Sequence, residues 1–208
     1  DEICGQYGVD PSSPIICQIS RFDMWKDPVG VIEAFRIVQH ELPDAQLVLA
    51  GSMATDDPEG FHMWELTEDA RGGDRRIHLL SNIQQVGSVQ VNAFQRAADV
   101  VLQKSLREGF GLTVSEALWK GRPVVGGKVG GITLQIRDGQ DGYLVESVEE
   151  CAARTIELLH NPTHADHMGS TGREHVRQNF LSTNNLESYL RLMREVTGVD
   201  TGAAAEDA

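Results

Sequence analysis

The sequence predicts an α/β fold, with a Rossmann-like, doubly wound parallel sheet of about six strands and additional helices at the C-terminal end. Short apolar runs rich in β-branched residues alternate with segments in which apolar residues recur at helical spacing. This alternation is typical of strand–helix–strand units and a parallel sheet. The length of 208 residues and the hydrophobic share of 40% are ordinary for a folded domain.

Six runs are expected to be strands because each is short, apolar and bounded by turn residues or polar loops. The runs are residues 15–19, 46–50, 77–80, 100–102, 123–125 and 143–145. Ligands of such sheets bind outside the carboxyl ends of the strands. The loops that follow the first four strands should therefore open on the same edge.

The helices are predicted from their spacing and their end signals. Asp27 and Pro28 supply an N-cap and a proline at the first helical position, and Gly121 suits the left-handed residue after a helix. Ser147 with Glu150 three residues later matches a capping box. The expected helices are residues 28–42, about 61–70, 89–98, 112–120, a segment from 147, 162–178 and 182–196.

Residues 1–197 are predicted to form a single domain, with a small, acidic and disordered tail over 198–208. The last helical segment carries Leu186, Tyr189, Leu190 and Met193 at helical spacing. One face should pack on the domain, and part of the segment should support a further lobe. An apolar patch left exposed without that lobe would favour a homo-oligomer. The chain begins without Met, as a fragment of a longer polypeptide would.

The composition of the chain excludes some classes of binding partner and indicates its cellular compartment. The net charge of −13 argues against nucleic acid or an anionic membrane as the main partner. No apolar run approaches the roughly 20 residues that span a bilayer. Cys4, Cys17 and Cys151 are widely spaced with no CxxC pair, which favours reduced cysteines in a cytoplasmic protein.

The most informative segment is residues 108–116, in which Glu108 and Glu116 flank a Gly-Phe-Gly turn that leads into a helix. A helix N-terminus offers free backbone N–H groups and about half a positive charge, so it can bind phosphate. Carboxylates on either side can accept hydrogen bonds from sugar hydroxyls. Either acid alone could be solvated or support a helix start, but the pair predicts a site for a diphosphate with a sugar at each end.

Arg21 and Lys26 share the loop after the first strand. They could be solvated loop charges, but in an acidic protein their position favours neutralisation of a diphosphate. Gly130 and Gly131 could form a simple turn or allow close approach of a ligand to the backbone. The sequence has no D-x-D triplet to hold a divalent ion on a diphosphate, no P-loop and no G-x-G-x-x-G, and Asp56–Asp57 is more simply a solvated pair.

Four segments carry a resemblance to a known family: S-R-F-D-x-W-K (20–26), G-x-M-A-x-D-D-P-E-G (51–60), S-x-R-E-G-F-G-L-T-V-x-E-A-x-W-K-G-x-P-V (105–124) and G-G-I-x-x-Q-I-x-D-G-x-x-G-x-L-V (130–145). The chain resembles family-4 retaining glycosyltransferases of the GT-B fold over about residues 5–195. Within them it is most similar to the trehalose synthase group, with trehalose phosphorylases as close relatives. The resemblance implies the C-terminal, donor-binding lobe, which needs an N-terminal lobe that carries most of the acceptor site.

The resemblance also implies roles for individual residues. Arg21 and Lys26 would contact the diphosphate and assist its departure, while Glu108 would face the transferred sugar and Glu116 the ribose hydroxyls. The base would meet the loop from Asn82 to Val86, largely through backbone groups. The residues expected against sugar and phosphates are Phe110, Gly111, Leu112 and Thr113.

The implied reaction transfers glucose from UDP-, ADP- or GDP-glucose to an acceptor, expected to be glucose, giving trehalose with retention of the anomeric configuration. No metal and no tightly bound cofactor are expected, and the lobe alone should be inactive. Two alternatives stay open: a trehalose phosphorylase lobe that uses phosphate, and a nucleotide-sugar binding module without catalysis.

Overall fold

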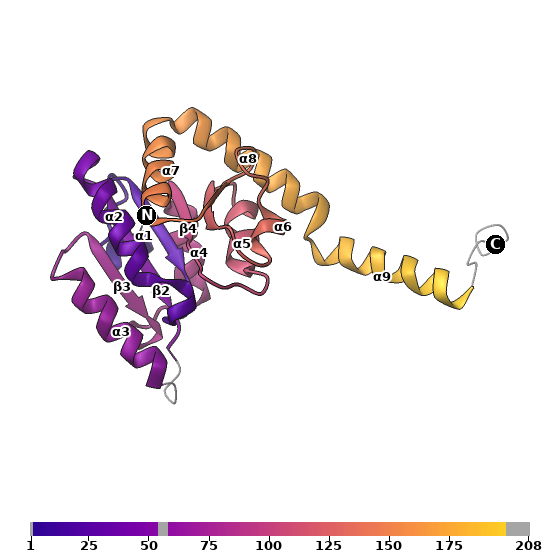
Figure 1. Ribbon diagram of the computed structural model, residues 1–208, viewed down its shortest axis with the longest axis horizontal. Helices are drawn as coiled ribbons and strands as arrows, with labels where there is room; N and C mark the ends of the chain where they lie inside the picture. The colour runs from indigo at the N-terminus through magenta and orange to yellow at the C-terminus, as the bar shows by residue number, and fades with distance from the viewer. Residues whose placement is uncertain (1, 54–57, 199–208) are drawn as a thin grey trace.

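The computed structural model describes residues 2–53 and 58–198. Six parallel strands form one sheet in the order β3-β2-β1-β4-β5-β6, with helices on both faces (Figure 1). The predicted fold class is therefore confirmed. The strands are β1 (Ile15–Ile19), β2 (Gln46–Gly51), β3 (Ile77–Ser81), β4 (Val100–Gln103), β5 (Val124–Gly127) and β6 (Tyr143–Val145).

At least one helix follows each strand along the chain, as a doubly wound sheet requires. They are α1 (Glu2–Gln6), α2 (Pro28–Glu41), α3 (Pro58–Arg71), α4 (Ser88–Ala97), α5 (Leu112–Trp119), α6 (Ile132–Gln135), α7 (Val148–His160), α8 (Pro162–Asn179) and α9 (Ser182–Thr197). Two 3₁₀ turns, η1 (Met24–Lys26) and η2 (Asn82–Gln84), follow β1 and β3. The sequence predicted neither α1 nor α6, nor these two turns, because each is shorter than two helical turns.

Two apolar cores lie on opposite faces of the sheet. One is covered by α2, which packs between α3 and α7, and the other by α1, α4 and α5. Every residue of β1 is buried, as is usual for a parallel strand covered on both faces. Three buried strand residues in this apolar setting are glutamines: Gln18 in β1, Gln46 in β2 and Gln103 in β4.

Most predicted helix ends are confirmed. The Asp27 side chain accepts a hydrogen bond from the Gly30 N–H at 3.1 Å, and Gly121 has a φ of 74° after α5. Only half of the predicted capping box forms. Ser147 accepts from the N–H of Glu150, but the Glu150 carboxylate accepts from the Glu146 N–H at 2.8 Å instead of from Ser147.

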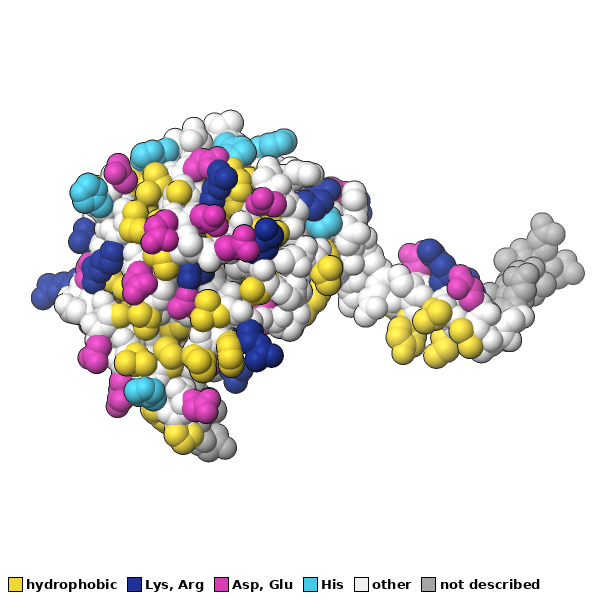
Figure 2. Space-filling model, in the orientation of Figure 1, with side chains coloured by type: hydrophobic (Ala, Val, Ile, Leu, Met, Phe, Trp, Pro, Cys, Tyr) yellow, Lys and Arg dark blue, Asp and Glu magenta, His cyan; other side chains and the backbone are white. Residues whose placement is uncertain are grey.

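The prediction that a face of the last helix packs on the domain is wrong. No residue of α9 is buried, and Figure 1 shows the helix leading away from the sheet. The apolar residues that anchor this region are Phe180 and Leu181, which pack against the second core before α9 begins. The exposed apolar row on α9 is visible in Figure 2 and consists of Leu186, Tyr189, Leu190, Leu192, Met193 and Val196. Except for Gly198, which ends α9, the predicted disordered tail lies outside the described residues.

The order of the strands in the sheet determines where a ligand site is expected. Strand β1 lies between β2 and β4, so the direction in which successive strands are added reverses at β1 and β4. Open α/β sheets bind ligands at such a switch point, beyond the carboxyl ends of the strands. The loops after β1 and β4 carry Arg21, Lys26 and Glu108, so the topology brings these three residues to the same edge.

Candidate functional site

The loops after β1 and β4 are joined by backbone and side-chain hydrogen bonds. The Leu106 N–H donates to the Trp25 carbonyl at 2.7 Å. The buried amide of Gln18 donates to the Lys26 carbonyl at 2.8 Å and accepts from the Lys104 N–H at 3.0 Å. The two loops therefore form one connected wall, which fixes the backbone at Lys26 relative to β4.

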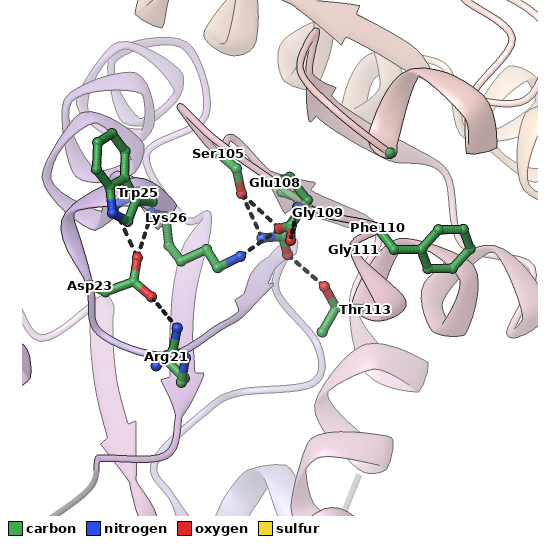
Figure 3. A network of polar contacts seen from close by, with 12 residues as sticks. Arg21, Asp23, Trp25, Lys26, Ser105, Glu108, Gly109, Phe110, Gly111 and Thr113 are labelled. Atoms are coloured by element: carbon green, nitrogen blue, oxygen red, sulfur yellow. Dashed lines mark hydrogen bonds and ion pairs between the residues drawn. The ribbon is translucent and has the colours of Figure 1, made fainter.

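Lys26 and Glu108 form the central contact of this wall (Figure 3). The ammonium Nζ lies 2.5 Å from Glu108 Oε2, and the side chains are only 16% and 10% exposed. Glu108 also accepts from the Ser105 hydroxyl at 3.3 Å and from the Gly109 N–H at 3.1 Å. The sequence predicted that these two residues share an edge of the sheet, but not that they form an ion pair.

Arg21 stands at the open side of the same cleft. Its guanidinium lies 3.2 Å from Asp23 and its side chain is 68% exposed, so it can reorient toward a ligand. Asp23 is held in turn because it accepts from the backbone N–H groups of Trp25 and Lys26 at 2.9 and 3.2 Å. Of the two cations predicted for a diphosphate, Lys26 is therefore half-buried and fixed, whereas Arg21 is exposed.

The cleft has a volume of about 520 Å³ and carries more positive than negative side chains. Arg21, Lys26 and Arg107 line it together with Asp23 and Glu108, a balance of 3 − 2 = +1 in a chain of net charge −13. The Arg107 guanidinium lies over the ring of Trp25 at 4.8 Å from its centroid. A local excess of cations in an acidic protein favours an anionic ligand.

The N-terminus of α5 adjoins Glu108. Gly111 precedes the helix with a φ of 83°, and a Cβ at this position would lie 3.2 Å from Glu108 Cγ. The backbone N–H groups of Leu112 and Thr113 have no acceptor among the described residues, as expected in the first turn of a helix. These groups are available to bind phosphate.

The turn before α5 is held by α6. The amide of Gln135, which is fully buried, donates to the carbonyl of Phe110 and accepts from the hydroxyl of Ser115. The Phe110 ring points away from the Lys26–Glu108 pair in Figure 3 and lies 5.8 Å from the ring of Phe180. The Leu112 side chain is exposed. Of the four residues predicted against sugar and phosphates, Gly111 lies next to the Glu108 side chain, and Thr113 is joined to Glu108 by hydrogen bonds through Gln103 and Ser105.

The glycine pair after β5 is required for contact between loops. A Cβ on Gly130 would lie 1.8 Å from the Glu108 carbonyl oxygen, and one on Gly131 would lie 2.5 Å from that of Gly109. The Gly131 N–H donates to the Gly109 carbonyl at 2.9 Å. The two glycines therefore form a tight turn against the Glu108 loop; Gly130 also lines the cleft, and close approach of a ligand to its backbone stays a prediction.

Glu116, Asn82 and Val86 lie outside the Lys26–Glu108 cluster. Glu116 is exposed in α5, and its carboxylate has no hydrogen-bond or ion-pair partner within residues 2–53 and 58–198. Asn82 begins η2 and accepts from the Met53 N–H at 2.7 Å. Val86 is buried and its N–H donates to the Ser81 carbonyl at 3.2 Å. The base-binding role of these loop residues stays a prediction.

Sequence reasoning missed four polar residues that organise the site. Gln18, Gln103 and Gln135 are buried side chains that hydrogen-bond to site loops, and Ser105 joins Gln103 to Glu108. A signal was present for two of them, because a glutamine inside an apolar strand must find partners when it is buried. Those partners could not be named without the structure.

No metal site is evident in the part of the chain that the structure describes, since no three His, Cys, Asp or Glu side chains gather there. The Asp56–Asp57 pair lies outside the described residues. Cys4, Cys17 and Cys151 are buried and free, and burial raises the pKa of the Cys151 thiol to about 12. None of the described helices is long and apolar enough to cross a membrane.

Comparison with known proteins identifies the family. Residues 1–175 match the family described as glycosyl transferases group 1. The chain is 54% identical over 197 residues to a trehalose synthase of Rubrobacter xylanophilus, covering 95% of this chain and 47% of that protein, and matches its C-terminal half. It is 29% identical over 196 residues to a trehalose phosphorylase of Grifola frondosa, covering 88% of this chain and 26% of that protein.

Solved structures agree with the fold. The structure of Anabaena HepE in complex with UDP-glucose superimposes with a TM-score of 0.76 at 19% identity, covering 95% of this chain and 52% of that one. The chain spans about half the length of the trehalose synthases that it matches. Its six-stranded parallel sheet with helices on both faces is that of a GT-B lobe. The chain belongs to the group 1 glycosyl transferases.

Proposed function

We propose that this chain is the donor-binding lobe of a retaining glycosyltransferase that moves glucose from a nucleoside diphosphate glucose to an acceptor. The observation that carries the proposal is the cleft lined by Lys26 and Glu108, together with the N-terminus of α5, which follows the Glu108 loop directly in the chain. Phosphate suits the cation and the helix N-terminus, and sugar hydroxyls suit the carboxylate. The 54% identity to a trehalose synthase favours glucose as the acceptor and trehalose as the product.

The roles of the residues follow from their surroundings. Lys26 has three N–H donors, of which one goes to Glu108, so it can hold a phosphate oxygen without releasing its partner. Arg21 is exposed and can turn from Asp23 to the same diphosphate. Glu116, whose carboxylate is exposed and accepts no hydrogen bond from residues 2–53 or 58–198, suits the ribose hydroxyls, and Glu108 suits the hydroxyls of the transferred glucose.

Departure of the nucleoside diphosphate would be assisted by charge. Negative charge develops on the leaving phosphate in the transition state, and fixed cations or helix N–H groups nearby stabilise it. In this proposal, Lys26, Arg21 and the N-terminus of α5 would provide this stabilisation. The proposed transfer therefore needs no divalent ion.

Binding by the 208-residue chain tests the donor site. UDP, ADP, GDP and their glucose conjugates are titrated by calorimetry with and without EDTA. We expect binding of at least one diphosphate and its conjugate, with the same affinity in EDTA. Binding lost on adding EDTA would reject the metal-free site, and no binding of any of these ligands would reject the donor site.

The complete reaction is expected to need a second lobe. Activity requires an acceptor held against the anomeric carbon, and such orientation is worth at best roughly 7–11 kcal/mol of the barrier. We expect no trehalose from the 208-residue chain with glucose and a nucleotide-glucose. Activity should appear on adding the N-terminal half of a trehalose synthase relative. Trehalose formation by the chain alone would contradict the proposal.

A trehalose phosphorylase lobe is a second candidate because such a protein is also similar to this chain. The two activities differ in their co-substrate, since a phosphorylase uses trehalose and inorganic phosphate. Phosphate-dependent release of glucose 1-phosphate by the reconstituted protein would favour the phosphorylase. Glucose transfer from a nucleotide-glucose would favour the synthase.

A further inference from the structure

A line of hydrogen bonds connects the N-terminus of α5 to Glu108. The Thr113 hydroxyl donates to Gln103 Oε1 at 2.7 Å, and Gln103 Nε2 donates to the Ser105 hydroxyl oxygen at 3.0 Å. The Ser105 hydroxyl donates in turn to Glu108 Oε2 at 3.3 Å, the oxygen that also receives the Lys26 ammonium. Figure 3 shows Thr113, Ser105 and Glu108 along this line.

All the donors in this line point the same way. Thr113 donates to the amide oxygen, the amide nitrogen donates to Ser105, and Ser105 has its single hydrogen left for Glu108. If the amide of Gln103 were turned over, its oxygen would take that hydrogen and Glu108 would lose it. Hydrogen bonds arranged head to tail polarise and strengthen one another, most of all away from water. Gln103 is buried, so its orientation is set by these partners.

We propose that Gln103 is a positioning residue that couples the phosphate-binding end of the cleft to its sugar-binding end. This inference rests on the proposed donor site. Through Thr113, Gln103 holds the first turn of α5, whose free N–H groups suit the phosphate. Through Ser105 it orients Glu108 toward the transferred sugar. A ligand that carries both groups should gain from this coupling, whereas a nucleoside diphosphate alone should not.

The coupling also assigns a role to the Thr113 hydroxyl. Its only hydrogen is directed to Gln103, so the phosphate would meet the backbone N–H of Thr113 and not its hydroxyl. Removing the amide frees that hydroxyl to donate to the phosphate. Loss of Gln103 is therefore expected to leave affinity for a nucleoside diphosphate unchanged, or to raise it slightly, while affinity for the glucose conjugate falls.

The test compares two affinities in the 208-residue chain. Calorimetry gives the ratio of the dissociation constant of a nucleoside diphosphate to that of its glucose conjugate, which measures the advantage due to the glucose. In Gln103→Met, which keeps the length but not the hydrogen bonds, we expect this advantage to fall about five- to tenfold, as for a lost hydrogen bond of roughly 1–1.4 kcal/mol. Affinity for the diphosphate should stay within about threefold.

Two further variants separate coupling from simple structural support. Ser105→Ala removes the link to Glu108 and the acceptor of the Gln103 amide, leaves the bond between Thr113 and Gln103 in place, and should lower the glucose advantage as Gln103→Met does. If circular dichroism shows that Gln103→Met is unfolded, Ser105→Ala provides the test in its place. Gln103→Glu keeps an acceptor for Thr113 but takes the Ser105 hydrogen, so it should lose the glucose advantage; its added negative charge disfavours the diphosphate and its conjugate alike, and only the ratio of the two dissociation constants is compared.

The outcomes distinguish the inference from the function on which it rests. No binding of any nucleotide by the unsubstituted chain would overturn both. A conjugate bound no better than the diphosphate would overturn the inference and leave the nucleotide site intact. An unchanged glucose advantage in Gln103→Met and Ser105→Ala, or an equal loss of both affinities, would likewise overturn it.

Discussion

The ion pair between Lys26 and Glu108 should contribute to stability as well as to binding, and Lys26→Met tests both. Removing one partner of a buried pair typically costs about 3–5 kcal/mol because the other charge is left uncompensated. Glu108 is 10% exposed and keeps the Ser105 hydroxyl and the Gly109 N–H as donors. We therefore expect the free energy of unfolding to fall by about 2–3 kcal/mol.

Arg21→Met is the matched control. Both cations are proposed to hold the diphosphate, but Arg21 is 68% exposed and pairs with Asp23 at the surface. Surface pairs contribute about 0–1 kcal/mol, so this change should alter stability by no more than that. Both variants should weaken binding of the nucleoside diphosphate, and only Lys26→Met should lower stability substantially.

Urea unfolding followed by circular dichroism gives the stability of each variant, and calorimetry gives the affinity. The comparison is valid if the dependence of the unfolding free energy on urea stays the same in all three proteins. Equal stability of Lys26→Met and Arg21→Met would refute the reasoning, because it would mean that burial adds nothing to the pair. Unchanged affinity in Lys26→Met would refute its role toward the phosphate.

Three other predictions use different parts of the structure. Glu116→Ala should lower nucleotide affinity by roughly 1.5–3 kcal/mol as a charged hydrogen-bonding partner is lost, yet change the unfolding free energy by less than about 0.5 kcal/mol; an unchanged affinity by calorimetry would remove its ribose role. Burial and a hydrogen bond to Glu157 raise the pKa of Tyr143 from 10.0 to about 12, so the folded state keeps a proton that the unfolded state loses. Stability should therefore fall as pH rises from 10 toward 12, and Tyr143→Phe should remove this part of the slope in urea unfolding at each pH. Leu190→Glu, on the exposed face of α9, should reduce self-association in sedimentation velocity; a chain that is monomeric before the change would contradict this role of the face.

The strands could be predicted because parallel strands covered on both faces are continuous apolar runs. Residues 15–19 and 143–145 coincide with β1 and β6, and the other four strands differ by one or two residues at their ends. Helix ends were predictable where a local signal decides them, as at Asp27 and Gly121. The second half of the capping box was not, because Glu150 could reach either of two neighbouring N–H groups.

The orientation of α9 could not be predicted from its own amphipathic pattern. An apolar face indicates that a helix has a partner but not which surface that partner presents. Phe180 and Leu181 fill the apolar position next to the second core, and Leu181 has an extended conformation that leads the chain away from the domain. The face of α9 is left exposed as a result.

The sequence predicted where on the sheet the candidate site lies, but not which of its side chains contact one another. Sheet topology brings the loop of Lys26 to the loop of Glu108, and this needs only the strand order. That Lys26 is paired with Glu108 depends on the distance between residues 82 positions apart in the chain. That Gln103 faces Thr113 and Ser105 depends on how the loop between β4 and α5 folds back on the end of β4. Buried polar side chains are where sequence patterns give least information, since each could be satisfied by many partners.

Both cations of the cleft are paired with carboxylates, Lys26 with Glu108 and Arg21 with Asp23, and this affects how an acidic chain could bind a diphosphate. Lys26 is held in place by Glu108, so its charge is fixed in position but already balanced. Adding phosphate groups beside that carboxylate would be unfavourable unless further positive charge reached them. The N-terminus of α5 supplies about half a charge without moving, and Arg21 supplies a full charge by leaving its surface partner Asp23. Lys26 would thus fix where the diphosphate lies, while Arg21 would balance its charge only when the ligand is present.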